Sequence, residues 1–222
     1  MARTLPVEIR VGADLIDGDL ATPPDAAGLV VFAHGSGSSR FSSRNRAVAQ
    51  VLQHGGFATL MMDLLTREED AADARTRQYR FDIELLGRRV TAALDRAQTE
   101  PGVAALPIAC FGASTGAAAA LIAAAGRPDV VRAVISRGGR PDLAGDALPL
   151  VQAPTLLIVG GHDEQVIDLN RAALRRMRAH VQLAIIPGVT HLFEEPGALE
   201  EVARLATDWC LLHLCSPGSR TA

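Results

Sequence analysis

Ser114 stands at the centre of a G-A-S-T-G pentapeptide, between an apolar segment and the alanine-rich run 117–125. A serine hydroxyl held on a sharp turn from a strand into a helix can act as a nucleophile, and the turn requires small residues two positions to either side. Gly112 and Gly116 meet this requirement. Because the pattern also arises by chance in proteins rich in Gly and Ala, covalent catalysis needs support from other residues.

A serine nucleophile needs a base, and His191 is the best-placed histidine. It follows the apolar segment 183–186, so it lies in a loop at the carboxyl end of an expected strand. His34 and His162 also follow strands, but we interpret His34 as a structural residue that hydrogen-bonds its loop and His162 as an exposed neighbour of the acid. The remaining histidines lie within or at the ends of helical patterns: His54, His180 and His213.

The third requirement is a carboxylate that orients the histidine, and Asp163 is our candidate. It follows the apolar segment 156–159 and two glycines, one strand before His191. Glu164 is adjacent and is the alternative acid. Asp142 and Asp168 fit less well, because the first follows an earlier strand and the second lies inside the next helical pattern. Three strand ends that supply nucleophile, acid and base are hard to obtain by chance.

Backbone N–H groups must hold the negative charge that develops on the acyl oxygen. Thr115 begins a helix, so its N–H is one expected donor. The segment 29–32 is followed by a Gly- and Ser-rich loop, in which the N–H of Ser36 is the expected second donor and Gly37 the next choice. Such a loop could instead cradle phosphate, but G-x-x-x-x-G-K-[ST] is absent and the sequence contains no lysine.

The elements that must position these residues alternate along the chain. Short apolar runs between helical patterns indicate parallel strands covered by helices on both faces. The expected strands are 7–11 and 15–20, which can pair antiparallel, and then 29–32, 60–62, 108–111, 130–135, 156–159 and 183–186. The expected helices are 43–55, 79–98, 114–125, 165–179 and 197–214, and in the last of these we expect Trp209 to lie in the core.

Composition limits the domain organisation and the partners. A chain of 222 residues suits one α/β domain, residues 1–222, with 216–222 as a flexible tail. A net charge of −3 and 4% aromatic residues argue against nucleic acid as a partner. We find no apolar run long enough for a membrane span and no signal-peptide pattern, so we expect no membrane partner and a cytoplasmic location. The three cysteines lack metal-ligand spacing, so we expect neither a metal site nor a disulfide.

The strand order, the elbow around Ser114, and the chain order Ser, Asp163, His191 resemble the α/β-hydrolase superfamily, and the size is most similar to the dienelactone hydrolase family. The resemblance implies two antiparallel leading strands, six parallel strands and helices on both faces. It also implies hydrolysis of a carboxylic ester or lactone without a cofactor. Dienelactone hydrolases carry Cys in the elbow, whereas Ser114 occupies it here and Cys110 lies upstream, which makes dienelactone itself a doubtful substrate.

The expected site is open, because only about 14 residues separate Arg140 from the strand near Thr155, too few for a cap domain. Two expected loops, 38–46 and 64–79, shape access to the site. Their arginines could bind a substrate carboxylate, but we favour pairing with nearby acids, Glu68, Glu69, Asp70 and Asp73. These arginines are Arg40, Arg44, Arg46, Arg67, Arg75 and Arg77.

The sequence therefore predicts a serine hydrolase that acts on a small-molecule ester or lactone through Ser114, His191 and Asp163. The same three groups also catalyse thioester hydrolysis, acyl transfer, C–C bond cleavage and cofactor-free peroxidation. The walls of the pocket, and not these three groups, select among such reactions. A different class of alternative is a hydrolase-like domain that binds a ligand without turnover. The sequence does not fix acyl length or oligomeric state.

Overall fold

The computed structural model describes residues 2–215. Its centre is one eight-stranded sheet with the order β1-β2-β4-β3-β5-β6-β7-β8. The two leading strands are antiparallel to each other, β2 is antiparallel to β4, and the other neighbours are parallel, which confirms the expected sheet. The strands are β1 (Arg3–Val11), β2 (Asp14–Thr22), β3 (Gly28–Ala33), β4 (Phe57–Met62), β5 (Ile108–Ala113), β6 (Val131–Arg137), β7 (Thr155–Gly160) and β8 (Val181–Ile186).

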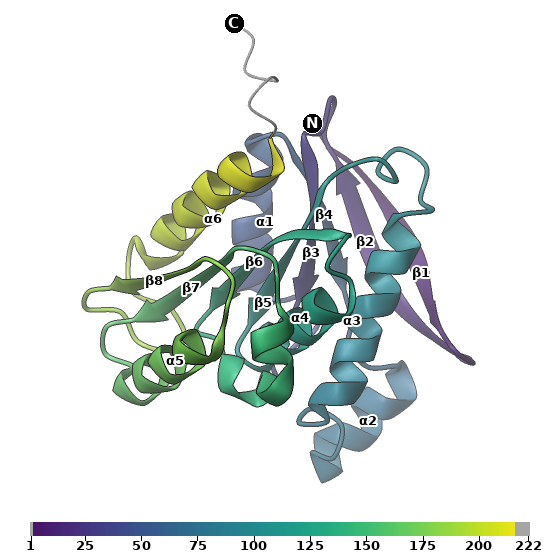
Figure 1. Cartoon of the computed structure of the whole chain (residues 1–222). Coiled ribbons are helices and arrows are strands. Elements are labelled where there is room, and N and C mark those ends of the chain that lie inside the picture. The colour runs from purple at the N-terminus through teal and green to yellow at the C-terminus, as the bar shows by residue number, and fades with distance from the viewer. Residues whose placement is uncertain (1, 216–222) are drawn as a thin grey trace, which may run out of the picture.

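Helices cover both faces of the sheet (Figure 1). On one face α1 packs beside α6, and on the other α3, α4 and α5 pack with the 3-10 segment η1. The elements are α1 (Ser43–His54), α2 (Arg67–Thr76), α3 (Ile83–Ala97), α4 (Thr115–Gly126), η1 (Pro141–Leu150), α5 (Glu164–Arg176) and α6 (Ala198–Leu214). The expected flexible tail, 216–222, lies outside the described residues.

The central strands are apolar because both of their faces are buried. Every residue of β3, β4, β5 and β7 is buried, as expected for parallel strands under two helical layers. Phe32 and Phe111 stack on the face that α1 and α6 cover, and Trp209 of α6 is buried on that face, as expected. This core makes the carboxyl ends of β3, β5, β6, β7 and β8 a rigid edge from which loops project.

The alanine-rich α4 is buried between the sheet and its neighbouring helices. Small side chains allow the close approach, and Gly87 of α3 lies so near Ile122 that a Cβ there would be 2.7 Å from the Ile122 side chain. The helix that carries the nucleophile turn is therefore held by packing on all sides.

Two elements in this fold differ from the sequence-based prediction. The segment 64–79, expected to be a loop, contains α2, which starts at a capping box formed by Thr66 and Glu69. The region 141–150, for which no helix was expected, forms η1. No other element lies between β6 and β7, which agrees with the predicted lack of a cap domain there. Of the ten residues in α2, only Asp73 is buried, so the helix has no apolar stripe for a periodicity analysis to detect.

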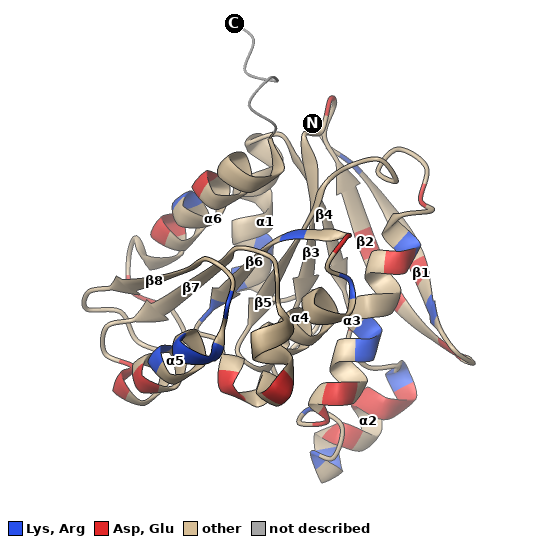
Figure 2. Ribbon diagram, in the orientation of Figure 1, with Lys and Arg blue, Asp and Glu red and all other residues tan. Residues whose placement is uncertain are grey.

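Charges lie mainly on the outer helices and loops. Figure 2 shows acidic and basic residues side by side along α2, α5 and α6, while β3, β4 and β5 carry none. No helix among residues 2–215 has the length and apolar character of a membrane span.

Candidate active site

The turn between β5 and α4 holds Ser114 in a strained backbone conformation, with φ of 50° and ψ of −122°. A non-glycine residue with positive φ costs about 1–3 kcal/mol, and such strain concentrates at functional sites. The neighbours leave no room for larger residues: a Cβ on Gly112 would lie 2.6 Å from the Ala117 nitrogen, and one on Gly35 would lie 3.1 Å from the Ser114 Cβ. The small residues that the sequence motif requires therefore have a steric cause.

His191 and Asp163 come together from neighbouring loops. The His191 Nδ1 lies 2.5 Å from the Asp163 Oδ2, a hydrogen bond between the loops that follow β8 and β7. Backbone bonds fix the two loops to each other: Gly161 N–H donates to the Ile186 carbonyl at 2.8 Å, and His162 N–H donates to the Val189 carbonyl at 2.9 Å. The imidazole is 39% exposed and the carboxylate 15% exposed, so the base lies nearer to solvent than the acid.

The other candidate acids lie elsewhere. Glu164 is exposed at the start of α5, and Asp168 is exposed further along the same helix. Asp142 pairs with Arg140 at 2.8 Å. Of the four acids that the sequence offered, Asp163 is the one whose oxygen meets His191. His162 is exposed beside it, as expected.

The expected oxyanion donors lie at the start of α4 and in the loop after β3. Thr115 is the first residue of α4, where backbone N–H groups have no helical acceptor. The Ser36 Oγ is 2.9 Å from the Thr115 Oγ1, so the loop after β3 is held against the start of α4. Gly37, the alternative donor, is exposed and has a φ of 66°.

A cavity of about 170 Å³ lies beside Ser114. It is small compared with pockets for drug-sized ligands, which hold roughly 300–1,000 Å³. Ser114 and His191 both line it, and so does Ser36. The other lining residues are Gly35, Ser38, Ser42, Arg44, Asn45, Ala113, Arg137, Gly138 and Leu192.

Cys110 is not placed for nucleophilic chemistry. It is fully buried in β5, and burial raises the pKa of its thiol to about 12. The thiolate is the reactive form, so at neutral pH Cys110 is an inert packing residue. The thiol nearest to Ser114 in the sequence is therefore a residue of the hydrophobic core.

His34 has the structural role that the sequence suggested. Its Nε2 accepts a hydrogen bond from the Leu64 N–H at 3.0 Å, and its Nδ1 lies 2.9 Å from the Gly35 carbonyl. This pattern requires a neutral ring with the proton on Nδ1. Burial lowers the pKa of His34 below its ordinary value of 6.5, although nearby Asp63 and Asp70 oppose the shift.

We expect the stability of the protein to fall as pH drops below about 6.5, because unfolded His34 gains a proton that the folded ring excludes. The loss begins near the unfolded pKa and continues until pH reaches the lower folded pKa, with a slope of up to about 1.4 kcal/mol per pH unit. His213 adds to it, since burial and His180 lower the pKa of His213 too. Urea unfolding from pH 7.5 to 5 measures the slope. His34→Gln should flatten it and the exposed-site control His54→Gln should not; equal slopes in both would contradict this role of His34.

The arginines of the two expected loops are mostly paired, but with other acids than predicted. Arg40 contacts Asp17, Asp19 and Asp63. The remaining pairs are Arg44 with Glu194, Arg46 with Asp19, and Arg67 with Asp17. The predicted partners Glu68, Glu69, Asp70 and Asp73 do not pair with these arginines among residues 2–215; Asp73 pairs with Arg80, and Glu69 pairs with Arg89. Of the predicted set, only Arg44 lines the cavity.

Sequence reasoning missed two further polar residues of the cavity, Arg137 and Asn45. Arg137 is the last residue of β6 and is 8% exposed, and its Nη2 donates to the Asn45 Oδ1 at 3.2 Å. Burial, together with the nearby charge of Arg44, lowers the pKa of Arg137 to about 10, which leaves it protonated at neutral pH. The signal in the sequence was an arginine at the carboxyl end of a predominantly apolar strand that carries a second arginine, Arg132, on an exposed position.

The mostly parallel sheet, with a strained serine turn after β5 and a hydrogen-bonded Asp–His pair in the loops after β7 and β8, is the arrangement of the α/β-hydrolase class. Within that class, the profile of the dienelactone hydrolase family matches residues 16–210, and the chain belongs to this family. The predicted resemblance and the predicted fold are thereby confirmed.

Several known proteins are similar to this chain. A crystal structure of dienelactone hydrolase from Anabaena variabilis is 54% identical, with a TM-score of 0.94, over 96% of this chain and 99% of that one. Est1E from Butyrivibrio proteoclasticus is 19% identical, with a TM-score of 0.78, over 93% and 98% of the two chains, a likeness of fold alone. A Mycobacterium tuberculosis protein named as a phosphoribosyl transferase is 56% identical over 212 residues, which are 96% of this chain and 47% of the relative. The chain thus spans about half the length of that curated relative.

Proposed function

We propose that this chain is a serine hydrolase that cleaves a carboxylic ester or lactone through an acyl-enzyme on Ser114. The observation that carries the proposal is the hydrogen bond from His191 Nδ1 to Asp163 Oδ2, made by a histidine that shares one cavity with a serine held at φ 50°. A structural role gives no reason for a strained serine and an oriented imidazole to line the same cavity.

In the proposed reaction, the Ser114 Oγ attacks the acyl carbon while His191 Nε2 takes its proton. The backbone N–H groups of Thr115 and Ser36 hold the oxyanion, and Asp163 fixes the imidazole tautomer and stabilises the imidazolium. When the C–O bond breaks, His191 gives the proton to the leaving oxygen. A water molecule then attacks the acyl-enzyme with His191 again as base, which releases the acid and restores Ser114. No step requires a cofactor or a metal ion.

The small cavity favours small acyl groups. With about 170 Å³ available, acetyl and butyryl groups suit it better than an octanoyl chain. The half-exposed His191 lies at the solvent side, so the leaving group that it protonates departs outward while the acyl group remains inside. Thioester hydrolysis and acyl transfer fit the same groups.

We expect Asp163→Asn to lower kcat for 4-nitrophenyl acetate and butyrate by about 10²- to 10⁴-fold, because the amide favours the wrong imidazole tautomer. Glu164→Gln is the matched control, because it removes the adjacent carboxylate, which is exposed and was the alternative acid. Initial rates of 4-nitrophenolate release measure both variants and the wild type, with octanoate as the long-chain comparison.

Three outcomes separate the alternatives. Loss in Asp163→Asn with wild-type rates in Glu164→Gln supports the proposed acid. The reverse result would assign the acid to Glu164. A folded wild type that hydrolyses none of the esters, together with no hydrolysis of the matching thioesters, would favour a hydrolase-like domain that binds without turnover.

The name of the mycobacterial relative does not extend to this chain, which covers 47% of that relative. The dienelactone hydrolase profile covers residues 16–210, which are nearly all of the part shared with that relative. We infer that the phosphoribosyl transferase name refers to the half of the relative that has no counterpart here. We propose a small molecule as the substrate, and the cytoplasmic location remains a prediction.

A further inference from the structure

The loop after β3 places Ser36 in the cavity that Ser114 lines. This loop lies directly against the nucleophile turn, because a Cβ on Gly35 would be 3.1 Å from the Ser114 Cβ and 3.3 Å from the Ala113 carbonyl oxygen. The proposed reaction uses the backbone N–H of Ser36 and gives no role to the hydroxyl of this half-buried side chain.

The Ser36 hydroxyl has two hydrogen-bonding neighbours, and they differ in distance. Its Oγ lies 2.9 Å from the Thr115 Oγ1, within the normal range for two hydroxyl groups. The same Oγ lies 3.4 Å from the Arg80 carbonyl oxygen, whereas O–H donors usually approach their acceptors to about 2.7–2.8 Å. The contact with Thr115 is therefore a firm hydrogen bond, and the contact with Arg80 is a weak one.

Burial decides which of the two hydroxyls donates. Thr115 is 4% exposed, and its Oγ1 has one hydrogen-bond partner among residues 2–215, the Ser36 Oγ. If Ser36 were the donor, the Thr115 proton would be buried without an acceptor, which is unfavourable and rare in proteins. Thr115 is therefore the donor, and Ser36 keeps its own proton for another acceptor.

The segment that joins α2 to α3 holds the weak acceptor in place. Asp73, which is buried in α2, accepts hydrogen bonds from the Arg80 N–H at 3.0 Å and from the Arg80 Nε at 2.5 Å. The guanidinium also packs against the loop after β3, since a Cβ on Gly37 would lie 3.1 Å from the Arg80 Nη1. Rotation about the Ser36 Cβ–Oγ bond redirects the proton from this carbonyl into the cavity and moves no heavy atom.

We propose that the Ser36 hydroxyl is a third donor to the oxyanion, in addition to the N–H groups of Ser36 and Thr115, and that the Thr115 hydroxyl orients it. As charge develops on the acyl oxygen, the Ser36 proton turns from the Arg80 carbonyl to that oxygen, while Thr115 continues to donate to the Ser36 Oγ. A hydroxyl that accepts a hydrogen bond is polarised into a stronger donor. No proton is transferred in this step. The inference rests on the proposed function, because it adds a group to that reaction.

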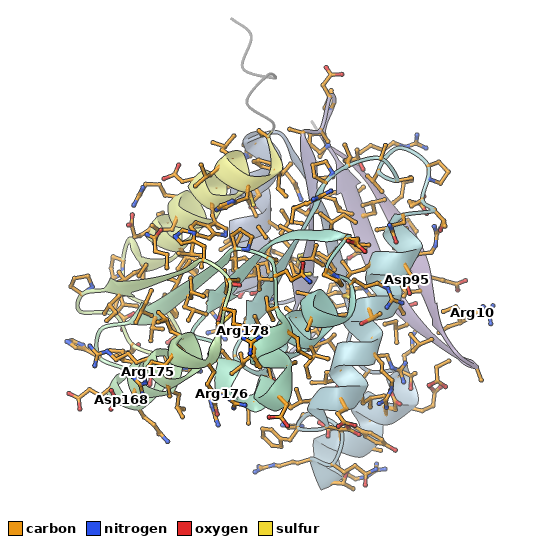
Figure 3. All side chains as sticks on the ribbon, in the orientation of Figure 1. Arg10, Asp95, Asp168, Arg175, Arg176 and Arg178 are labelled. Carbon is orange, nitrogen blue, oxygen red and sulfur yellow. The ribbon has the colours of Figure 1, made fainter. Side chains whose placement is uncertain are left out.

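Ser36→Ala tests the hydroxyl alone, because alanine keeps the backbone N–H. We expect kcat for 4-nitrophenyl butyrate to fall about 10²-fold, since acylation and deacylation both pass through an oxyanion, and KM to change much less. Ser39→Ala is the matched control: it removes a hydroxyl from the same loop at a residue that does not line the cavity. Arg175→Ala, at a side chain directed outward from α5 (Figure 3), measures the variation between preparations.

Thr115 variants test the orienting role. Thr115→Val keeps the shape of the side chain without its hydroxyl and should lower kcat about tenfold, whereas Thr115→Ser should restore most of the wild-type value. Ser36→Ala/Thr115→Val should be no slower than Ser36→Ala, because the Thr115 hydroxyl acts through Ser36. This double variant also contains no unpaired Thr115 hydroxyl, so it remains measurable if Ser36→Ala fails to fold. Losses that multiply in the double variant would overturn the orienting role.

A boronic acid distinguishes oxyanion binding from a general change in the protein. Butylboronic acid accepts the Ser114 Oγ at boron, His191 takes the hydroxyl proton, and the adduct is a tetrahedral anion. Because this adduct resembles the transition state, its Ki in Ser36→Ala should rise about as much as kcat/KM falls. A fall in kcat/KM with an unchanged Ki would mean that the loss arises outside the oxyanion site, and the third donor would be rejected.

The same measurements separate this inference from the proposed function. If the wild type hydrolyses the ester and Ser36→Ala matches it in kcat and Ki, the hydroxyl is not a donor and the hydrolase proposal stands. A folded wild type that neither hydrolyses an ester nor binds butylboronic acid would overturn both.

Discussion

Ser114→Ala should lower kcat for 4-nitrophenyl butyrate by about 10⁴- to 10⁶-fold, because removal of the nucleophile disables the unit that it forms with His191 and Asp163. Any residual rate would come from binding and from the oxyanion donors, which the substitution leaves in place. The fold should be retained, since alanine fits the space of serine and the Ser114 hydroxyl is not a helix cap for α4. Initial rates and the far-ultraviolet circular dichroism of both proteins measure the two effects.

Cys110→Ala is the control for the rival nucleophile. Because Cys110 is a buried thiol with a pKa raised to about 12, we expect this variant to keep its activity. A fluorophosphonate should label the wild type, and peptide mass spectrometry should place the adduct on residue 114. Equal activity of wild type and Ser114→Ala would show that the triad is wrongly assigned, and loss of activity in Cys110→Ala with a preserved fold would point to the thiol.

The sheet could be predicted because each of its central strands is buried on both faces. Burial of that kind produces continuous apolar runs such as 156–159, and the runs appear at intervals that leave room for one helix each. The segment α2 could not be found in this way, since Asp73 is its one buried residue and polar contacts attach it to the protein. The sequence feature that indicates α2 is local: the capping box formed by Thr66 and Glu69 marks the start of a helix even where no apolar stripe follows.

The three catalytic candidates could be predicted because their positions follow from connectivity. Residues that leave the carboxyl ends of parallel strands share one edge, so Ser114, Asp163 and His191 had to lie near one another once the strands were identified. Arg137 leaves the same edge, yet no local pattern distinguishes it from the many surface arginines. Arg137 differs from the surface arginines in that no carboxylate pairs with its guanidinium among residues 2–215. Ion pairs of this kind join residues far apart in sequence, such as Arg89 and Asp14, so they cannot be predicted from local patterns.

Gly116→Ala should destabilise the protein by more than about 3 kcal/mol, the range in which an added group collides with atoms that cannot relax. A Cβ at this position would overlap the carbonyl oxygens of Ala33 and His34. Both oxygens belong to backbone, and Ala33 is the last residue of β3 in the middle of the sheet, so neither can move without distorting the strand or the loop that carries Ser36. Urea unfolding at pH 7.5 measures the change.

Gly126→Ala provides a control in the same helix. Gly126 ends α4, has no neighbour within 4 Å of an added Cβ, and lacks a positive φ. Alanine at this position lowers the conformational entropy of the unfolded chain and causes no clash in the folded protein. The free energy of unfolding should therefore be unchanged or rise by up to about 1 kcal/mol. Opposite signs for the two substitutions would separate close approach at the elbow from the general effect of glycine in a helix. Equal and small effects would mean that α4 does not press against β3, and the elbow would then lack the support that holds Ser114 at positive φ.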